Sequence, residues 1–191
     1  MYELQEMVVK KSVHNNEQPQ WYAMRVTYNR EMSVKHLLEA ASFVFYLPMR
    51  FVIKLRQGKK VRLMEPAVRG LMFVKSTFSE LLRFKSKLPH LQFMTRKYQN
   101  RNVPIVVSPS QMDAFIKATS VEDGSIEYFE SGQLNLAEGT RVRVHGGELD
   151  GIEGIYKRVS GRRARRLVIQ VENVLAIAID LQSVNFIEVL K

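Results

Sequence analysis

The sequence predicts two domains: an α+β domain in which helices flank a mainly antiparallel sheet, followed by a small all-β barrel. Three observations lead to this prediction. Helical and strand periods alternate as far as residue 119, every charge in residues 120–136 is acidic, and a glycine-rich hairpin covers residues 138–159. We divide the chain into a flexible polar tail (1–20), the α+β domain (21–119), an acidic linker (120–136) and the barrel (137–191).

The elements of the first domain follow from the spacing of its apolar residues. Residues 21–28 are rich in strand formers, and an apolar stripe at positions 34, 37, 38 and 41 predicts a helix. Period-two alternation in residues 49–64 predicts a hairpin that turns at Gln57-Gly58, and the apolar run 70–74 predicts a central strand. Further elements are a helix at 79–88, strands at 91–94 and 105–107, and a helix that Ser108-Pro109 starts.

The predicted hairpin at 49–64 contains six bases and no acid. One interpretation is that these bases form its solvated outer face, which is what most charged runs do. The other is that the hairpin is a basic finger lying along nucleic-acid phosphates. The sequence leaves both open for Arg50, Lys54, Arg56, Lys59, Lys60 and Arg62.

Composition restricts the class of protein. The 191 residues have a net charge of +10, of which residues 1–119 contribute +12, residues 120–136 −4 and the remainder +2. A basic first domain suggests a polyanionic partner nearby. The chain has no cysteine, no secretory signal at its N-terminus and no apolar run long enough to cross a membrane. We expect a soluble, cytoplasmic protein.

The glycine hairpin opens the second domain. Val142 and Val144 alternate with polar residues, the chain reverses at Gly146-Gly147, and Gly151 and Gly154 follow at a spacing of three. Glycines so placed suit the tight corner of a small curved barrel, although an ordinary hairpin of any all-β domain would also fit. Residues 167–171, 175–181 and 186–190 supply three more strands, and their β-branched residues favour strand over helix.

Nothing in the sequence indicates an enzyme. The four histidines are scattered, and no phosphate-binding or dinucleotide-binding glycine loop is present. Glu148, Asp150 and Glu153 do not have the spacing of a calcium loop, so we interpret them as a solvated tip and expect no catalytic residues, metal or cofactor. A second basic cluster either grips phosphate or keeps a hairpin tip soluble; it consists of Lys157, Arg158, Arg162, Arg163, Arg165 and Arg166.

The glycine hairpin resembles a KOW motif, the hairpin of small SH3-like barrels in ribosomal proteins and transcription elongation factors. The residues that carry this resemblance are Gly139, Val142, Val144, Gly147, Gly151 and Gly154. The first domain, through Trp21-Tyr22-Ala23-Met24-Arg25-Val26, the following helix and Arg69-Gly70-Leu71-Met72-Phe73-Val74, resembles the N-terminal domain of NusG-type transcription factors. Many family members have F-P-G-Y where this chain has Val68-Arg69-Gly70-Leu71.

The resemblance implies a monomeric elongation factor that binds the clamp helices of the RNA polymerase β′ subunit and suppresses pausing and termination. It implies polymerase contacts through Val68, Leu71 and Phe73, with Phe93 as their neighbour on the next strand. Upstream or non-template DNA would lie near Arg30, Arg83 and Lys87, and the barrel would recruit a ribosomal protein or a termination factor.

Within the family, the polar tail, the basic hairpin and the barrel sequence are most similar to the UpxY-type antiterminators of capsular polysaccharide operons. Two alternatives remain open. One is a ribosome-associated RNA-binding KOW protein, and the other is the general housekeeping NusG factor.

Overall fold

The computed structural model describes residues 18–120, 126–130, 132–135, 137–159, 164–181 and 185–190. These residues form two compact units, which are described separately. The N-terminal unit consists of residues 18–47 and 69–107, and the C-terminal unit consists of the described parts of residues 48–68 and 108–191. Most of the predicted tail lies outside the described residues, and the predicted domain boundaries at 119 and 137 stay predictions.

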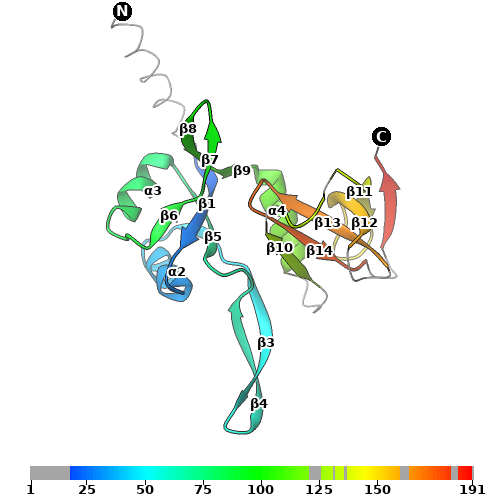
Figure 1. Cartoon of the computed structure of the whole chain (residues 1–191), viewed down its shortest axis with the longest axis horizontal. Helices are drawn as coiled ribbons and strands as arrows, with labels where there is room; N and C mark the ends of the chain where they lie inside the picture. Colours follow the sequence, from blue (N-terminus) through cyan, green and yellow to red (C-terminus); the bar gives the residue numbers. More distant parts are fainter. Residues whose placement is uncertain are drawn as a thin grey trace, which may run out of the picture. The chain divides into compact units, whose positions relative to one another are not determined.

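An antiparallel sheet forms the centre of the N-terminal unit (Figure 1). Its strands run in the order β2-β5-β1-β6, and β9 also pairs with β1. Their bounds are β1 Gln20–Val26, β2 Val44–Tyr46, β5 Leu71–Ser76, β6 Leu91–Phe93 and β9 Val106–Val107. The four apolar residues that open β5 are all buried, as their unbroken apolar run predicts for a strand covered on both faces.

Two helices accompany this sheet, α2 (Glu31–Ala40) and α3 (Phe78–Lys85). The apolar stripe of α2 buries Val34 and Leu38. α3 begins after Thr77, whose side chain accepts a hydrogen bond from Glu80 N at 3.2 Å and so caps the helix. The prediction of an α+β domain with a mainly antiparallel sheet and helices is confirmed.

The first residue of α2 fixes the turn that precedes β5. Glu31 is buried, and its Oε1 accepts a hydrogen bond from Gly70 N at 2.7 Å. Gly70 has a φ of +69°, and a Cβ there would lie 2.8 Å from the carbonyl oxygen of Val26. Val26 N in turn donates to Gly70 O at 2.9 Å. The turn therefore requires glycine for two reasons, its backbone conformation and the closeness of β1.

β3 (Met49–Arg56) and β4 (Lys59–Pro66) form a separate two-stranded hairpin, as predicted. Its turn residues, Gln57 and Gly58, have φ values of 50° and 76°. Two successive positive φ values are typical of a type I′ turn, whose twist matches that of the strands it joins.

A second two-stranded hairpin, which the sequence pattern does not predict, consists of β7 (Thr95–Tyr98) and β8 (Arg101–Pro104). It turns at Gln99 and Asn100, with φ values of 46° and 61°. The signal in the sequence is weak because the hairpin has no alternating apolar face, and only the turn-forming asparagine marks it.

In the C-terminal unit, helix α4 (Pro109–Thr119) begins where the sequence predicts. The hydroxyl of Ser108 accepts a hydrogen bond from Gln111 N at 3.3 Å, and Pro109 occupies the first turn. Met112 and Phe115 are fully buried.

A six-stranded antiparallel sheet follows, in the order β10-β14-β13-β12-β11-β15 (Figure 1). The bounds are β10 Glu127–Glu130, β11 Thr140–His145, β12 Glu153–Arg158, β13 Arg165–Val171, β14 Leu175–Ile179 and β15 Phe186–Val189. The described residues after 137 contain no helix. The predicted small all-β domain of the SH3-like type is confirmed.

The strand β10 lies within residues 120–136, the predicted linker, and the sequence alone leaves open whether the apolar residues of this segment form a strand. It pairs with β14 so that Tyr128 lies opposite Ile177. Phe129 packs against a buried cluster that includes Val168 and Ala178. The apolar and aromatic residues of this segment outweigh its acidic composition, and burying them extends the sheet by one strand.

Candidate functional site

Two glycines of the KOW-like hairpin lie where a side chain would not fit. β11 and β12 pair so that Val142 lies opposite Gly154. A Cβ on Gly154 would lie 2.6 Å from Val168 O on the neighbouring strand β13, and a Cβ on Gly139 would lie 2.4 Å from Ile155 Cγ2. Both glycines are therefore places where backbone passes close to another strand.

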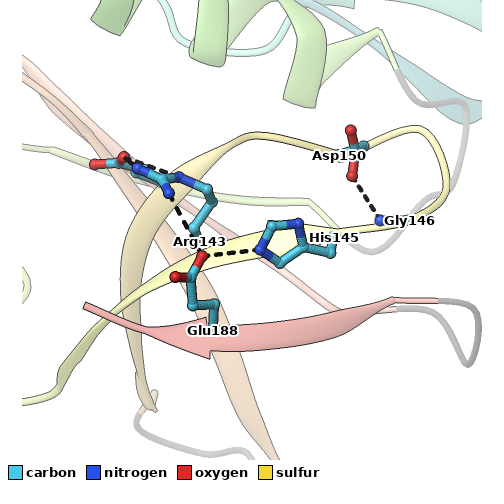
Figure 2. A network of polar contacts seen from close by, with 6 residues as sticks. Arg143, His145, Gly146, Asp150 and Glu188 are labelled. Atoms are coloured by element: carbon cyan, nitrogen blue, oxygen red, sulfur yellow. Dashed lines mark hydrogen bonds and ion pairs between the residues drawn. The ribbon is translucent and has the colours of Figure 1, made fainter.

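Backbone hydrogen bonds close the turn between β11 and β12. Val144 N donates to Ile152 O, and Gly151 N donates to Val144 O, each at 2.8 Å. Gly146 N donates to Asp150 Oδ1, also at 2.8 Å (Figure 2). The glycines of the turn have positive φ at Gly146 (83°), Gly147 (64°) and Gly151 (81°). The Asp150 side chain thus stabilises the turn by accepting this hydrogen bond.

Two of the three carboxylates near this turn have partners within the protein. Asp150 accepts from the turn, and Glu153 forms an ion pair with Arg143, with 2.6 Å between Oε1 and Nη2. No group of three or more potential ligands that could hold a metal ion occurs in the described part of the chain. The interpretation of Glu148, Asp150 and Glu153 as a solvated tip stays a prediction.

Figure 2 shows a polar network that ties the edge strand β15 to β11. Glu188 Oε2 lies 2.9 Å from His145 Nε2 and 3.4 Å from Arg143 Nη1, while the same arginine also pairs with Glu153. The His145 hydrogen bond, and then the charge of Arg143, hold the pKa of Glu188 below its usual value. The His145 ring stacks on exposed Phe186 at a centroid distance of 5.2 Å.

The second basic cluster does not form one exposed basic surface, because one of its arginines is buried. Arg166 is fully buried, its Nε donates to Asp180 Oδ1 at 2.7 Å, and its Nη1 lies 3.2 Å from Glu127 Oε2. Lys157 Nζ donates to the carbonyl oxygen of Asn135. Arg166 therefore links β13 to β10 and to the residue that follows β14, and it is not available to phosphate. Arg162 and Arg163 lie outside the described residues.

The expected polymerase-contact residues do not share one face of the N-terminal sheet. Leu71 and Phe73 are buried on one face of β5. Phe93 pairs across β1 with Met24, which pairs with Met72, so Phe93 lies on the opposite face. The prediction that Phe93 neighbours Leu71 and Phe73 is wrong, because the strand register places it one residue out of phase.

Phe93 instead belongs to an aromatic cluster. Its ring centroid lies 5.5 Å from that of Tyr22 and 5.4 Å from that of Phe78, and Lys85 Nζ lies 5.8 Å from the Phe93 centroid. Burial raises the pKa of the Tyr22 hydroxyl. Phe93 and Phe78 are half-buried, and so is Val68, which follows β4 in the C-terminal unit.

The bases of the β3–β4 hairpin are divided between its two faces. Cross-strand pairs share a face, and Arg56 pairs with Lys59 whereas Leu55 pairs with Lys60. Lys54, Arg56 and Lys59 therefore project on one side, and Lys60 and Arg62 on the other.

Local partners also reduce the free charge of this hairpin. Glu65 forms ion pairs with Lys54 at 2.7 Å and Arg50 at 3.2 Å, and these two bases lower the pKa of its carboxyl, Lys54 most. Arg62 lies over the Phe51 ring, 3.6 Å from its centroid. The window of six bases without an acid ends at Met64, one residue before the acid that neutralises part of it.

The predicted nucleic-acid contacts of the N-terminal unit are all exposed: Arg30, Arg83 and Lys87. Arg30 precedes α2, Arg83 lies in the last turn of α3, and Lys87 follows that helix. Bases at a helix C-terminus also interact favourably with the helix dipole, which by itself accounts for part of this placement. Sequence reasoning missed three further exposed bases on β7 and β8: Arg96, Lys97 and Arg101.

Comparison with known proteins gives the family. Residues 19–116 match the family described as Transcription termination factor nusG. Among solved structures, the chain is similar to one titled "Domain interaction in Thermotoga maritima NusG", with 16% sequence identity and a TM-score of 0.43 over 88% of this chain and 96% of that one. No curated protein matches by sequence.

The described part of the chain contains no helix that is long and apolar enough to span a membrane. The family match includes the whole N-terminal sheet and helices α2 and α3, and it spans just over half of the 191 residues. The chain therefore belongs to the NusG family of transcription factors.

Proposed function

We propose that this protein is an elongation and antitermination factor that binds the clamp helices of the RNA polymerase β′ subunit and suppresses pausing and termination. The observation that carries the proposal is the family match of residues 19–116, followed along the chain by the glycine-centred all-β domain. No cofactor is needed, because binding alone can hold a clamp closed. The factor acts as a monomer in the cytoplasm.

The polymerase contact is an apolar surface that captures the tip of a helical hairpin. Of the four residues expected to form it, the half-buried Val68 and Phe93 can reach a partner, while Leu71 and Phe73 support the sheet from within. We place the contact on the face of Phe93, where Phe78 adds a second half-buried ring.

Two matched substitutions test this contact. Phe93→Ser removes a ring from the proposed face, and Val44→Ser removes an exposed apolar side chain from the opposite face, since Val44 pairs with Lys75 in register with Phe73. In a pull-down with purified polymerase, Phe93→Ser should lose binding and Val44→Ser should retain it. The reverse pattern would reject the assigned face. If both variants bind polymerase like the parent, neither residue belongs to the contact.

Leu71→Asp would be a poor test of polymerase binding. Leu71 is only 4% exposed, and a carboxylate in that place costs several kcal/mol of stability before any partner is present. A loss of binding would then report unfolding.

We further propose that the factor is specialised for a polysaccharide biosynthesis operon and that upstream or non-template DNA contacts its basic residues. Arg30, Arg83 and Lys87 are exposed and can reach phosphate, and the exposed face of the barrel can bind a ribosomal protein or a termination factor. Deleting the gene and sequencing RNA tests the specialisation: transcripts of one operon should fall. A change in most transcripts would indicate the housekeeping factor, and co-purification with ribosomal subunits in place of polymerase would indicate a ribosomal role.

A further inference from the structure

The β7–β8 hairpin is held firmly at its base by the central strand of the N-terminal sheet. Met94 N donates to Ala23 O at 2.9 Å, Ala23 N donates to Ile105 O at 3.1 Å, and Ile105 N donates to Met94 O at 2.8 Å. Two of these hydrogen bonds join the ends of the hairpin to one fully buried residue of β1, and the third joins the two ends to each other. The hairpin is therefore a fixed projection of the sheet, and Figure 1 shows β7 and β8 extending beyond it.

One face of this hairpin combines an aromatic ring with arginines. Tyr98 pairs with Arg101, and Arg96 pairs with Val103. Residues two apart on a strand share a face, and so do direct cross-strand partners, which places the Tyr98 ring and both arginines on the same side. The opposite side carries Lys97.

The aromatic ring on this face is exposed to solvent. Tyr98 is 60% exposed, although its strand lacks any other large apolar side chain. The ten residues from Thr95 to Pro104 contain three bases and no acid. A solvated aromatic ring next to basic residues suits a ligand that has both flat apolar rings and negative charge.

We propose that the β7–β8 hairpin binds single-stranded nucleic acid, with a base stacked on the Tyr98 ring and the adjoining phosphate held by Arg101. Directly opposed Cβ atoms lie about 5 Å apart, so one nucleotide can reach the ring and the guanidinium group together. Guanidinium groups bind phosphate oxygens in a bidentate manner. A duplex does not fit, because its base faces are already covered by neighbouring bases, and the ring needs an uncovered one.

This site is separate from the proposed polymerase contact and does not depend on it. Its test uses the purified full-length protein without polymerase, so the failure of one proposal leaves the other standing. Fluorescence anisotropy would measure binding to labelled oligo(dT) and oligo(rU), each about 12 nucleotides long, within the range of small single-strand binding folds. A duplex of the same length would serve as a comparison ligand.

Four variants separate stacking from charge and from general exposure. Tyr98→Thr keeps a strand-forming residue but removes the ring, and should weaken binding by about tenfold, as loss of one stacked base does. Tyr98→Phe should bind like the parent. Arg101→Gln should reduce the slope of log affinity against log salt by about 0.7. The control Phe186→Thr removes an equally exposed aromatic (66%) from strand β15 and should leave binding unchanged.

If Tyr98→Thr weakens binding to oligo(dT) alone, the hairpin is a DNA site, and if it weakens binding to oligo(rU) alone, the hairpin is an RNA site. Weaker binding to both would show that the hairpin accepts either nucleic acid. Each of these results supports the proposal. Three outcomes would overturn it: Tyr98→Thr binds like the parent, Tyr98→Phe loses as much as Tyr98→Thr, or the duplex binds as tightly and as dependently on Tyr98. An unchanged Trp21 fluorescence transition in urea would verify that each variant keeps its fold.

Discussion

Gly70→Ala should destabilise the N-terminal unit more than a glycine substitution ordinarily does. At a φ of +69°, a residue with a Cβ is disfavoured by about 1 kcal/mol. The new Cβ would also lie 2.8 Å from Val26 O, which is backbone of the central strand and can move only by shifting the sheet. Overpacking of this kind costs about 1–3 kcal/mol, so the total loss in the free energy of unfolding is about 3 kcal/mol.

The single tryptophan allows this to be measured in the full chain. Trp21 is buried in β1, so its fluorescence follows the unfolding of the N-terminal unit. Since the urea dependence for a small domain is about 1–3 kcal/mol per molar, the midpoint should fall by about 1–3 M. Glu31→Ala, which leaves Gly70 N without its acceptor, should cost about 1–3 kcal/mol, and Glu31→Gln less, because the amide oxygen can still accept.

Gly58→Ala is the matched control for this prediction. Gly58 has a similar φ of +76°, but its Cβ would meet nothing within 4 Å, and it lies in the separate β3–β4 hairpin. The Trp21 transition should not move. A Gly70→Ala protein that unfolds at the parent's midpoint, or a Gly58→Ala protein that shifts as far, would refute the reasoning.

Three further predictions concern the barrel and the charged surface. Gly154→Ala should destabilise the C-terminal sheet by about 2 kcal/mol in calorimetry, because its Cβ would lie 2.6 Å from Val168 O, and a parent-like transition would contradict this. The pKa of Glu188, measured by NMR titration, should lie below its usual value, and His145→Ala should raise that pKa. A carboxyl with a lowered pKa stabilises the fold above its usual pKa and loses this effect as pH falls through the lowered value, so amide protection in β15 should decrease there. Arg83→Ala should reduce the salt slope of DNA binding by about 0.7, and an unchanged slope would remove this residue from the contact.

The elements that depend on nearby residues were predictable from the sequence. The turn at Gln57-Gly58 follows from two residues that accept positive φ between alternating strands. The Ser108-Pro109 start of α4 follows from capping chemistry, because the serine side chain and the proline both act within the first turn of the helix. In each case the cause lies within a few positions along the chain.

What escaped prediction depends on residues that are distant in sequence. The face on which Phe93 lies is set by its register with Met24, and a shift of one residue reverses it. The composition of β10 is that of a linker, and only pairing with β14 makes it a strand. Arg166 is one arginine of a basic run until the fold places Asp180 and Glu127 beside it.

The three hydrogen bonds at the base of the β7–β8 hairpin have a consequence for how this protein can vary. Because Met94 and Ile105 bond to each other and to Ala23, the sheet is complete without the ten residues between them. The arm can therefore lengthen or shorten by whole cross-strand pairs while the domain beneath it stays the same. Removing one residue from a single side would instead exchange the two faces of that strand and turn Tyr98 away from Arg101. Relatives of this chain should differ here in arm length by even numbers of residues, and changes of one should be rare.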